Sequence, residues 1–195
     1  DEALGNTRRH PITMPPGHGK SLLTSQYFRA WYLGNYPARR VILASYEADF
    51  AAGWGRKARD LLEEHGPSLL DISIAKESKA ADRWEIAHHG GGMITAGVGG
   101  AITGRGSNIL IIDDPVKNAE EANSETYREK TWEWYTSTAY TRLEPAGAVI
   151  LIMTRWHEGD LAGRILAQQS EPTSDSWRVL NLPALAEDTD ALGRA

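Results

Sequence analysis

Three nearly continuous apolar runs constrain the fold of this chain more than any other feature of its sequence. They lie at residues 41–45, 109–112 and 149–153. Strands that are buried on both faces of a parallel sheet have this composition, whereas strands with one solvated face alternate between apolar and polar residues. The stretches between the runs carry longer helical patterns, and helices are the usual connections between parallel strands. The sequence therefore predicts an α/β fold with a mostly parallel central sheet flanked by helices.

Weaker patterns predict the remaining elements. Leu23, Tyr27 and Trp31 recur at helical spacing and would share one face of a helix. Two short apolar segments flank the glycine-rich residues 88–92, which indicates a hairpin. Further strands are expected at 9–14, 72–75, 84–87, 93–96 and 177–181, and helices at 20–35, from 51 to near Gly66-Pro67, at 123–140 and at 159–169.

Length and composition limit the classes of protein that the chain can represent. Its 195 residues suffice for one domain with a sizeable core, which we place at residues 1–183, with 184–195 as the start of a linker. The absence of cysteine excludes disulfides and thiolate zinc sites. A formal net charge of −5 means that contact with a polyanion would need a local basic patch or another part of a longer protein. No apolar run approaches the roughly 20 residues of a membrane span.

The segment 15–21 has the composition of a phosphate-binding loop between a strand and a helix. Backbone N–H groups in such a loop converge on an anion, and the helix dipole adds to the attraction. Lys20 would contact the β- and γ-phosphates, and the Ser21 hydroxyl would reach a magnesium ion. The usual pattern G-x-x-x-x-G-K-[ST] has Met14 in place of its first glycine, so the alternative is a glycine-rich turn that begins a helix. The predicted nucleotide-binding residues are Pro16, Gly17, His18, Gly19, Lys20, Ser21 and Leu22.

An acidic pair follows the second apolar run, at the position of a Walker B motif. Open α/β sheets bind ligands at the carboxyl ends of their strands, which is where Asp113 and Asp114 would emerge. We expect Asp113 to hold magnesium and Asp114 to act as a general base toward water. The alternative is a turn or helix-capping role, because Pro115 follows directly.

Two further polar residues are candidates for the same site. Thr154 ends the third apolar run and would lie beside the γ-phosphate, where it could sense hydrolysis; the alternative is an ordinary threonine at a strand end. Arg105 lies in a glycine-rich loop before the acidic strand, and its guanidinium suits the charge that develops during phosphoryl transfer. The alternative for Arg105 is a solvated loop arginine.

Taken together, these residues resemble the ATPase domain of the large terminase subunit of tailed bacteriophages, the motor that packages DNA. The most specific part is the run T-R-W-H-x-x-D-L that begins at Thr154. The similarity extends over about residues 8–185. The segments that carry it are 14–21, 41–46, 103–106 leading into 110–115, and 154–161.

The resemblance implies a P-loop NTPase of the additional-strand type that uses ATP and Mg2+. Lys20 and Ser21 would be its phosphate-loop residues, Asp113 its magnesium ligand, Asp114 its catalytic carboxylate and Thr154 part of its coupling motif. Arg105 would be an arginine finger, able to act on a neighbouring subunit. Two departures from the family pattern are an aspartate at 114, where many relatives have glutamate, and a glycine at 17, where many have arginine.

The resemblance also implies partners and a location. These are double-stranded DNA, the portal and the small terminase subunit, with self-association into a ring on the capsid, in the cytoplasm of an infected bacterium. An isolated domain is expected to be monomeric and to have no membrane contact. The family's C-terminal nuclease domain would follow this segment, so we expect no nuclease activity from it.

Two other functions remain open at this point. A nucleotide-dependent regulatory switch would use the same loop with slow or no turnover, but the N-K-x-D motif of GTPase switches does not occur, and no D-x-x-G directly follows the acidic strand. A helicase-like P-loop ATPase would use a D-E-x-D/H tetrad, which is also absent.

Overall fold

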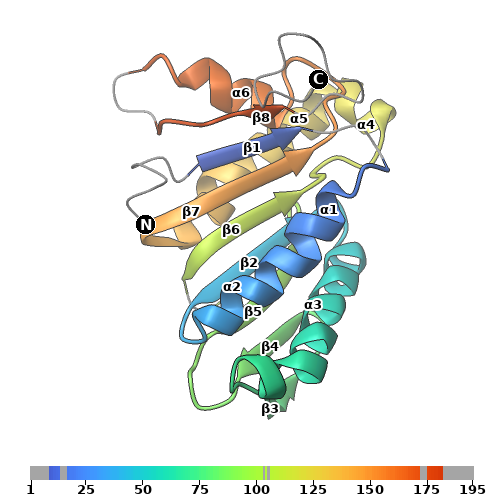
Figure 1. Cartoon of the computed structure of the whole chain (residues 1–195). Helices are drawn as coiled ribbons and strands as arrows, with labels where there is room; N and C mark the ends of the chain where they lie inside the picture. Colours follow the sequence, from blue (N-terminus) through green and yellow to red (C-terminus); the bar gives the residue numbers. More distant parts are fainter. Residues whose placement is uncertain (1–8, 14–16, 103, 105, 172–174, 182–195) are drawn as a thin grey trace, which may run out of the picture.

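A computed structural model describes residues 9–13, 17–102, 104, 106–171 and 175–181. Figure 1 shows the arrangement of their helices and strands. The strands are β1 (Arg9–Thr13), β2 (Arg40–Ser45), β3 (Ile74–Lys79), β4 (Arg83–Ile86), β5 (Gly92–Gly97), β6 (Ser107–Asp113), β7 (Leu143–Met153) and β8 (Leu180–Asn181). The helices are α1 (Lys20–Leu22), η2 (Leu23–Phe28), α2 (Arg29–Asn35), α3 (Ala48–Leu69), α4 (Ala119–Asn123), α5 (Glu125–Trp134), η3 (Tyr135–Ala139), η4 (Tyr140–Arg142) and α6 (Leu161–Gln168).

The described strands form one sheet in the order β3-β4-β5-β2-β6-β7-β1-β8. From β5 to β8 every neighbouring pair is parallel, and β3 and β4 are added in antiparallel orientation. The predicted α/β fold with a mostly parallel sheet is therefore confirmed. Strand β7 lies between β1 and β6, so one additional strand separates the strand of the phosphate loop from the strand of the acidic pair.

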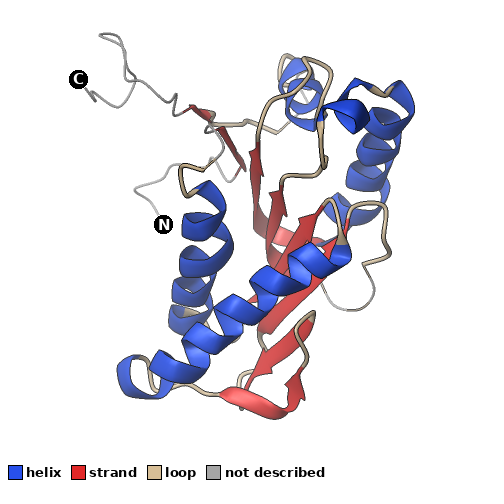
Figure 2. Cartoon of the chain, turned by 90° about the vertical axis from the view of Figure 1, so that its right-hand side faces the viewer, coloured by secondary structure: helices blue, strands red, loops and turns tan. Residues whose placement is uncertain are grey.

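Helices cover both faces of the sheet because successive residues of the apolar strands point to opposite sides. Val41 and Leu43 of β2 belong to a core cluster with residues of α2 and α3, whereas Ile42 and Ala44 belong to a second cluster with residues of α5, η3 and α6. Figure 2 shows helices on the two sides of the sheet. Burial on both faces explains why these strands have no alternating pattern.

The helix that follows the phosphate loop runs without a break from Lys20 to Asn35, as predicted. Its middle section, η2, is π-helical rather than α-helical. Such segments are rare and often occur at functional sites. The section begins between Ser21 and Ser25, so it affects which side chains of this helix face the sheet.

Several element boundaries differ from the sequence-based expectations. Strand β7 begins at Leu143 rather than 149, and the helix expected at 123–140 begins at Glu125 and continues through α5, η3 and η4. Helix α3 continues past Pro67 to Leu69, because a proline in the last turn removes a single hydrogen bond and Leu70 N still bonds to Gly66 O at 3.0 Å. Strand β3 begins at Ile74 rather than 72, and the last strand contains only Leu180–Asn181. Strand β8 is a sheet edge that pairs with β1 alone, so it has one neighbour to set its length. Within the described ranges, no helix is both long and apolar enough to cross a membrane.

Candidate active site

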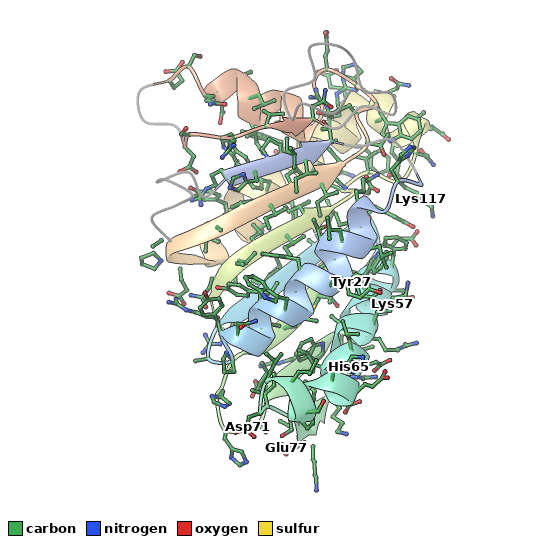
Figure 3. All side chains as sticks on the ribbon, in the orientation of Figure 1. Tyr27, Lys57, His65, Asp71, Glu77 and Lys117 are labelled. Atoms are coloured by element: carbon green, nitrogen blue, oxygen red, sulfur yellow. The ribbon has the colours of Figure 1, made fainter. Side chains whose placement is uncertain are left out.

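The ends of four parallel strands form the site. Strands β1, β2, β6 and β7 run in one direction, so their carboxyl ends meet at one edge of the sheet (Figure 1). Lys117 lies at this edge, whereas Asp71 and Glu77 lie at the opposite end of the molecule (Figure 3). A cavity of about 490 Å3 opens here, lined by Gly17, Gly19, Lys20, Ser21, Leu22, Tyr46, Trp54, Asp114, Val116, Lys117, Thr154 and Trp156.

Lys20 is the first residue of α1, and its side chain points across the loop toward β6 and β7. Its Nζ donates a hydrogen bond to Thr154 Oγ1 at 2.8 Å and lies 3.1 Å from Asp114 Oδ2. Only 8% of Lys20 is exposed. The ammonium group is thus held by two residues from two other strand ends, at the wall of the cavity.

Asp113 is the last residue of β6 and is fully buried. Ser21 Oγ donates a hydrogen bond to its Oδ1 at 2.9 Å, and Ser25 Oγ donates one to its Oδ2 at 2.5 Å. Ser45 Oγ, at the end of β2, donates a hydrogen bond to its backbone oxygen at 2.6 Å. Three serine hydroxyls therefore fix Asp113, and two of them come from the phosphate-loop helix.

A buried arginine supplies positive charge near Asp113. Arg29 of α2 is fully buried, and its Nη2 donates a hydrogen bond to Trp54 O at 3.3 Å. Burial lowers the pKa of the Arg29 guanidinium to about 9, and the charge of Asp113 opposes that fall. Burial raises the pKa of Asp113, Asp114 raises it further, and Ser25, Ser21 and Arg29 oppose the rise. Both groups lose hydration, and each one's charge favours the ionised form of the other.

Asp114 begins the loop after β6 with a left-handed backbone, at φ 46°. Aspartate tolerates this region better than most residues. Its Oδ1 accepts a hydrogen bond from Thr154 N at 2.9 Å, while Oδ2 faces Lys20. Its backbone N–H donates to Ile152 O at 2.8 Å and its backbone oxygen accepts from Tyr46 N at 3.2 Å. Asp114 therefore connects β7, β2 and the phosphate loop.

The predicted phosphate loop is described from Gly17 onward. Gly17 and Gly19 have φ values of 79° and 80°, and a Cβ at either position would meet nothing within 4 Å. Glycine is therefore required here by the backbone conformation rather than by crowding. His18 is exposed, and Leu22 is 45% exposed at the cavity wall. Pro16 and Arg105, both predicted site residues, lie outside the described residues.

The run from Thr154 to Leu161 forms the loop between β7 and α6 together with the first residue of α6. Asp160 is the N-cap of α6, and its Oδ1 accepts a hydrogen bond from Gly163 N at 2.9 Å. Arg155 Nε lies 2.7 Å from Asp160 Oδ2, and His157 Nδ1 accepts from Gly159 N at 2.9 Å. The run is thus a compact capping structure directly after the cavity residue Thr154.

Sequence reasoning brought out Lys20, Ser21 and the acidic pair but missed other residues at this edge. Ser25 was not singled out, although it lies one helical turn after Ser21 and so shares its face of the helix. Two aromatic residues that line the cavity, Tyr46 and Trp54, were not singled out either. Tyr46 directly follows β2, and Trp54 belongs to α3. No local motif connects these two residues to the phosphate loop.

Comparisons with known proteins agree with this architecture. The crystal structure of the HK97 bacteriophage large terminase is similar to this chain with a TM-score of 0.60 and 15% identity, covering 93% of this chain and 37% of that chain. The structure of a large terminase from a thermophilic bacteriophage gives a TM-score of 0.54 and 11% identity, covering 93% of this chain and 43% of that chain. At these identities the likeness shows the fold. The chain spans well under half the length of either protein.

A family comparison goes further than the fold. No curated protein matches the sequence. The family described as "Terminase large subunit, T4likevirus-type, N-terminal" matches residues 12–195, which is nearly the whole chain. The chain therefore belongs to the family of terminase large subunits of the T4likevirus type and corresponds to their N-terminal part.

Proposed function

We propose that this chain is the ATPase domain of a viral DNA-packaging motor, which hydrolyses ATP with Mg2+ to translocate double-stranded DNA into a procapsid. One observation carries the proposal: Lys20 and Ser21 of the phosphate loop meet Asp113, Asp114 and Thr154 at one edge of the sheet. Cation, hydroxyl and carboxylates are the groups that P-loop phosphoryl transfer requires.

The loop geometry fits a triphosphate. The open backbone at Gly17 and Gly19 leaves room for phosphate oxygens to approach the N–H groups. Lys20 Nζ is already at the wall of a cavity of about 490 Å3, a size typical of small-molecule sites. A phosphate group would compete with Asp114 for this ammonium group.

The oxygen atoms near Ser21 fit a magnesium ion. Ser21 Oγ and Asp113 Oδ1 lie 2.9 Å apart, and hard oxygen ligands are those that Mg2+ prefers. When bound, Mg2+ would neutralise charge on the phosphate oxygens. Asp113 would hold the ion, with Ser21 as a second protein ligand.

The remaining residues have roles in the chemistry and its coupling. Asp114 would accept a proton from the attacking water, as a general base on the cavity wall. Thr154 contacts both Lys20 and Asp114, so a change at either group alters the start of the loop that leads into α6. Arg105 would add transition-state charge, in the same subunit or a neighbouring one.

The wider role rests on the family. Terminase large subunits are the basis for proposing double-stranded DNA, the portal and the small terminase subunit as partners, with assembly into a ring on the capsid. The cytoplasm of an infected bacterium is the matching location. The lone domain lacks a neighbouring subunit, so we expect its ATP hydrolysis to be measurable but slow.

The test is steady-state phosphate release from ATP, with and without double-stranded DNA and with and without Mg2+. Lys20→Ala and Asp113→Asn should reduce the rate to background, because they remove the cation and the charge that holds the metal. Lys79→Ala is the matched control, since Lys79 is an exposed lysine of β3 that pairs with Glu63 at 2.9 Å. Unchanged rates in both site variants would refute the assignment. Tight binding with no turnover, with or without DNA, would favour a regulatory switch.

A further inference from the structure

The two oxygens of the buried Asp113 carboxylate have different partners on the phosphate-loop helix. Oδ1 accepts from Ser21, which lines the cavity, and Oδ2 accepts from Ser25, which is fully buried and lies one turn deeper. Oδ1 is therefore the carboxylate oxygen that is bonded to a cavity residue, and in the proposed function it is the oxygen that would hold the metal ion. Oδ2 faces the interior of the protein.

Only one of these two hydrogen bonds can persist unchanged when a metal binds. If Ser21 becomes a metal ligand, its oxygen turns a lone pair to the ion and its bond to Oδ1 must adjust. Ser25 does not line the cavity and keeps its bond to Oδ2. It would then be the side-chain donor that holds the carboxylate in its orientation.

We propose that Ser25 is a positioning residue for the magnesium site, holding Asp113 through Oδ2 so that Oδ1 is presented to the ion beside Ser21. This inference rests on the proposed ATP–Mg2+ function. Removal of a residue that hydrogen-bonds to a metal ligand and orients it commonly lowers metal affinity about 10- to 100-fold. A purely structural role for Ser25 would change stability and leave metal dependence unaltered.

The backbone supports this arrangement. Ser45 Oγ holds the Asp113 backbone oxygen at 2.6 Å, and β6 is paired on both sides, with Ser45 and Ile152 opposite Asp113. The main chain of Asp113 is therefore already fixed. What remains for Ser25 to control is the rotation of the side chain.

The experiment measures binding of a fluorescent ADP analogue to the full chain, in EDTA and across a magnesium titration. Ser25→Ala should leave the affinity in EDTA within about twofold of the wild type. It should raise the magnesium concentration at half-saturation about tenfold. Ser25→Cys keeps the volume and a weak donor, so it should fall between the two. If circular dichroism shows that the alanine variant is unfolded, Ser25→Cys is used in its place.

Ser107→Ala is the matched control. Ser107 is fully buried at the other end of β6, and its hydroxyl has no partner among the described residues. It should show the magnesium dependence of the wild type. A folded Ser25→Ala or Ser25→Cys with wild-type half-saturation would overturn the inference, as would equal losses with and without magnesium. Failure of the wild type to bind the analogue, or equal binding by Lys20→Ala, would overturn the proposed function as well.

Discussion

Lys20 Nζ lies 3.1 Å from Asp114 Oδ2, so the cation of the phosphate loop and the second acid of the pair form an ion pair across the cavity wall. The Asp114 side chain is 30% exposed, and the Lys20 side chain 8%. A phosphate group entering the cavity must therefore take Lys20 from an existing partner. That exchange would free the Asp114 carboxylate for another contact at the moment when substrate binds.

Replacing Asp114 with asparagine should separate binding from turnover. Asp114→Asn keeps the size of the side chain, removes the competing charge and removes the proposed base. We expect hydrolysis to fall about 100-fold or more, with nucleotide affinity unchanged or tighter. Phosphate release and equilibrium binding, measured on the same preparation, check both halves. Weaker binding with unchanged turnover would contradict both roles.

Thr154 can be tested through its hydroxyl alone. Thr154→Val removes the hydrogen bond to Lys20 Nζ but keeps the backbone N–H that donates to Asp114. A hydrogen bond to a charged group is worth about 1.5 kcal/mol, so kcat/KM should fall roughly tenfold. Thr154→Ser retains the hydroxyl and should keep most of the activity. A loss in Thr154→Ser with little or none in Thr154→Val would point to packing of the methyl group instead.

The buried charge of Asp113 makes folding stability depend on pH. Its pKa is raised in the folded protein above the ordinary value of 3.8, mainly by burial. The native state therefore holds this proton at pH values where the unfolded chain has lost it, and stability falls as pH rises from 3.8 to the folded pKa. Above that window the loss is complete. Each unit of elevation corresponds to about 1.4 kcal/mol.

Urea unfolding of the wild type and Asp113→Asn at pH values from about 4 to about 7 isolates this contribution, because other groups cancel in the difference. The wild type should lose stability relative to the asparagine variant as pH rises. Ser107→Ala, which alters a buried residue of the same strand without changing a titratable group, should show no such trend. If the wild type instead gained stability relative to Asp113→Asn as pH rises, the pKa of Asp113 would be lowered rather than raised on folding.

We expect Asp160 to stabilise the loop after β7. Its buried carboxylate caps α6 at Gly163 N and pairs with Arg155. Asp160→Ala removes both, so we expect a loss of about 2 kcal/mol in the free energy of unfolding. Asn118→Ala removes an exposed cap from the short helix α4 and should cost less than half as much. Similar losses in both variants would mean that the Arg155 pair contributes nothing.

The strand pattern and the strand–loop–helix unit around Lys20 were predictable because their signals are local. Apolar runs such as 109–112 mark strands that are buried on both faces, and Lys20 follows the glycines that a phosphate loop needs. The proximity of Lys20 to the acidic pair could also be expected, since the carboxyl ends of parallel strands meet at one edge. Strand boundaries were predicted less well, since the interior strand β7 begins at Leu143 rather than 149. At β8, where pairing is with β1 alone, the strand is shorter than its apolar pattern indicated.

By itself, the sequence determined the fold class, because hydrophobic periodicity acts over a few residues. The resemblance of its motifs pointed to the family, and its glycine placement and acidic pair gave the candidate site residues. Only the tertiary structure decided that Asp114 pairs with Lys20, that Ser25 holds the inner oxygen of Asp113, and that Tyr46 and Trp54 line the cavity. These contacts join residues far apart in the chain. They depend on strand order and on the rotation of the phosphate-loop helix, which are set by packing over the whole sheet.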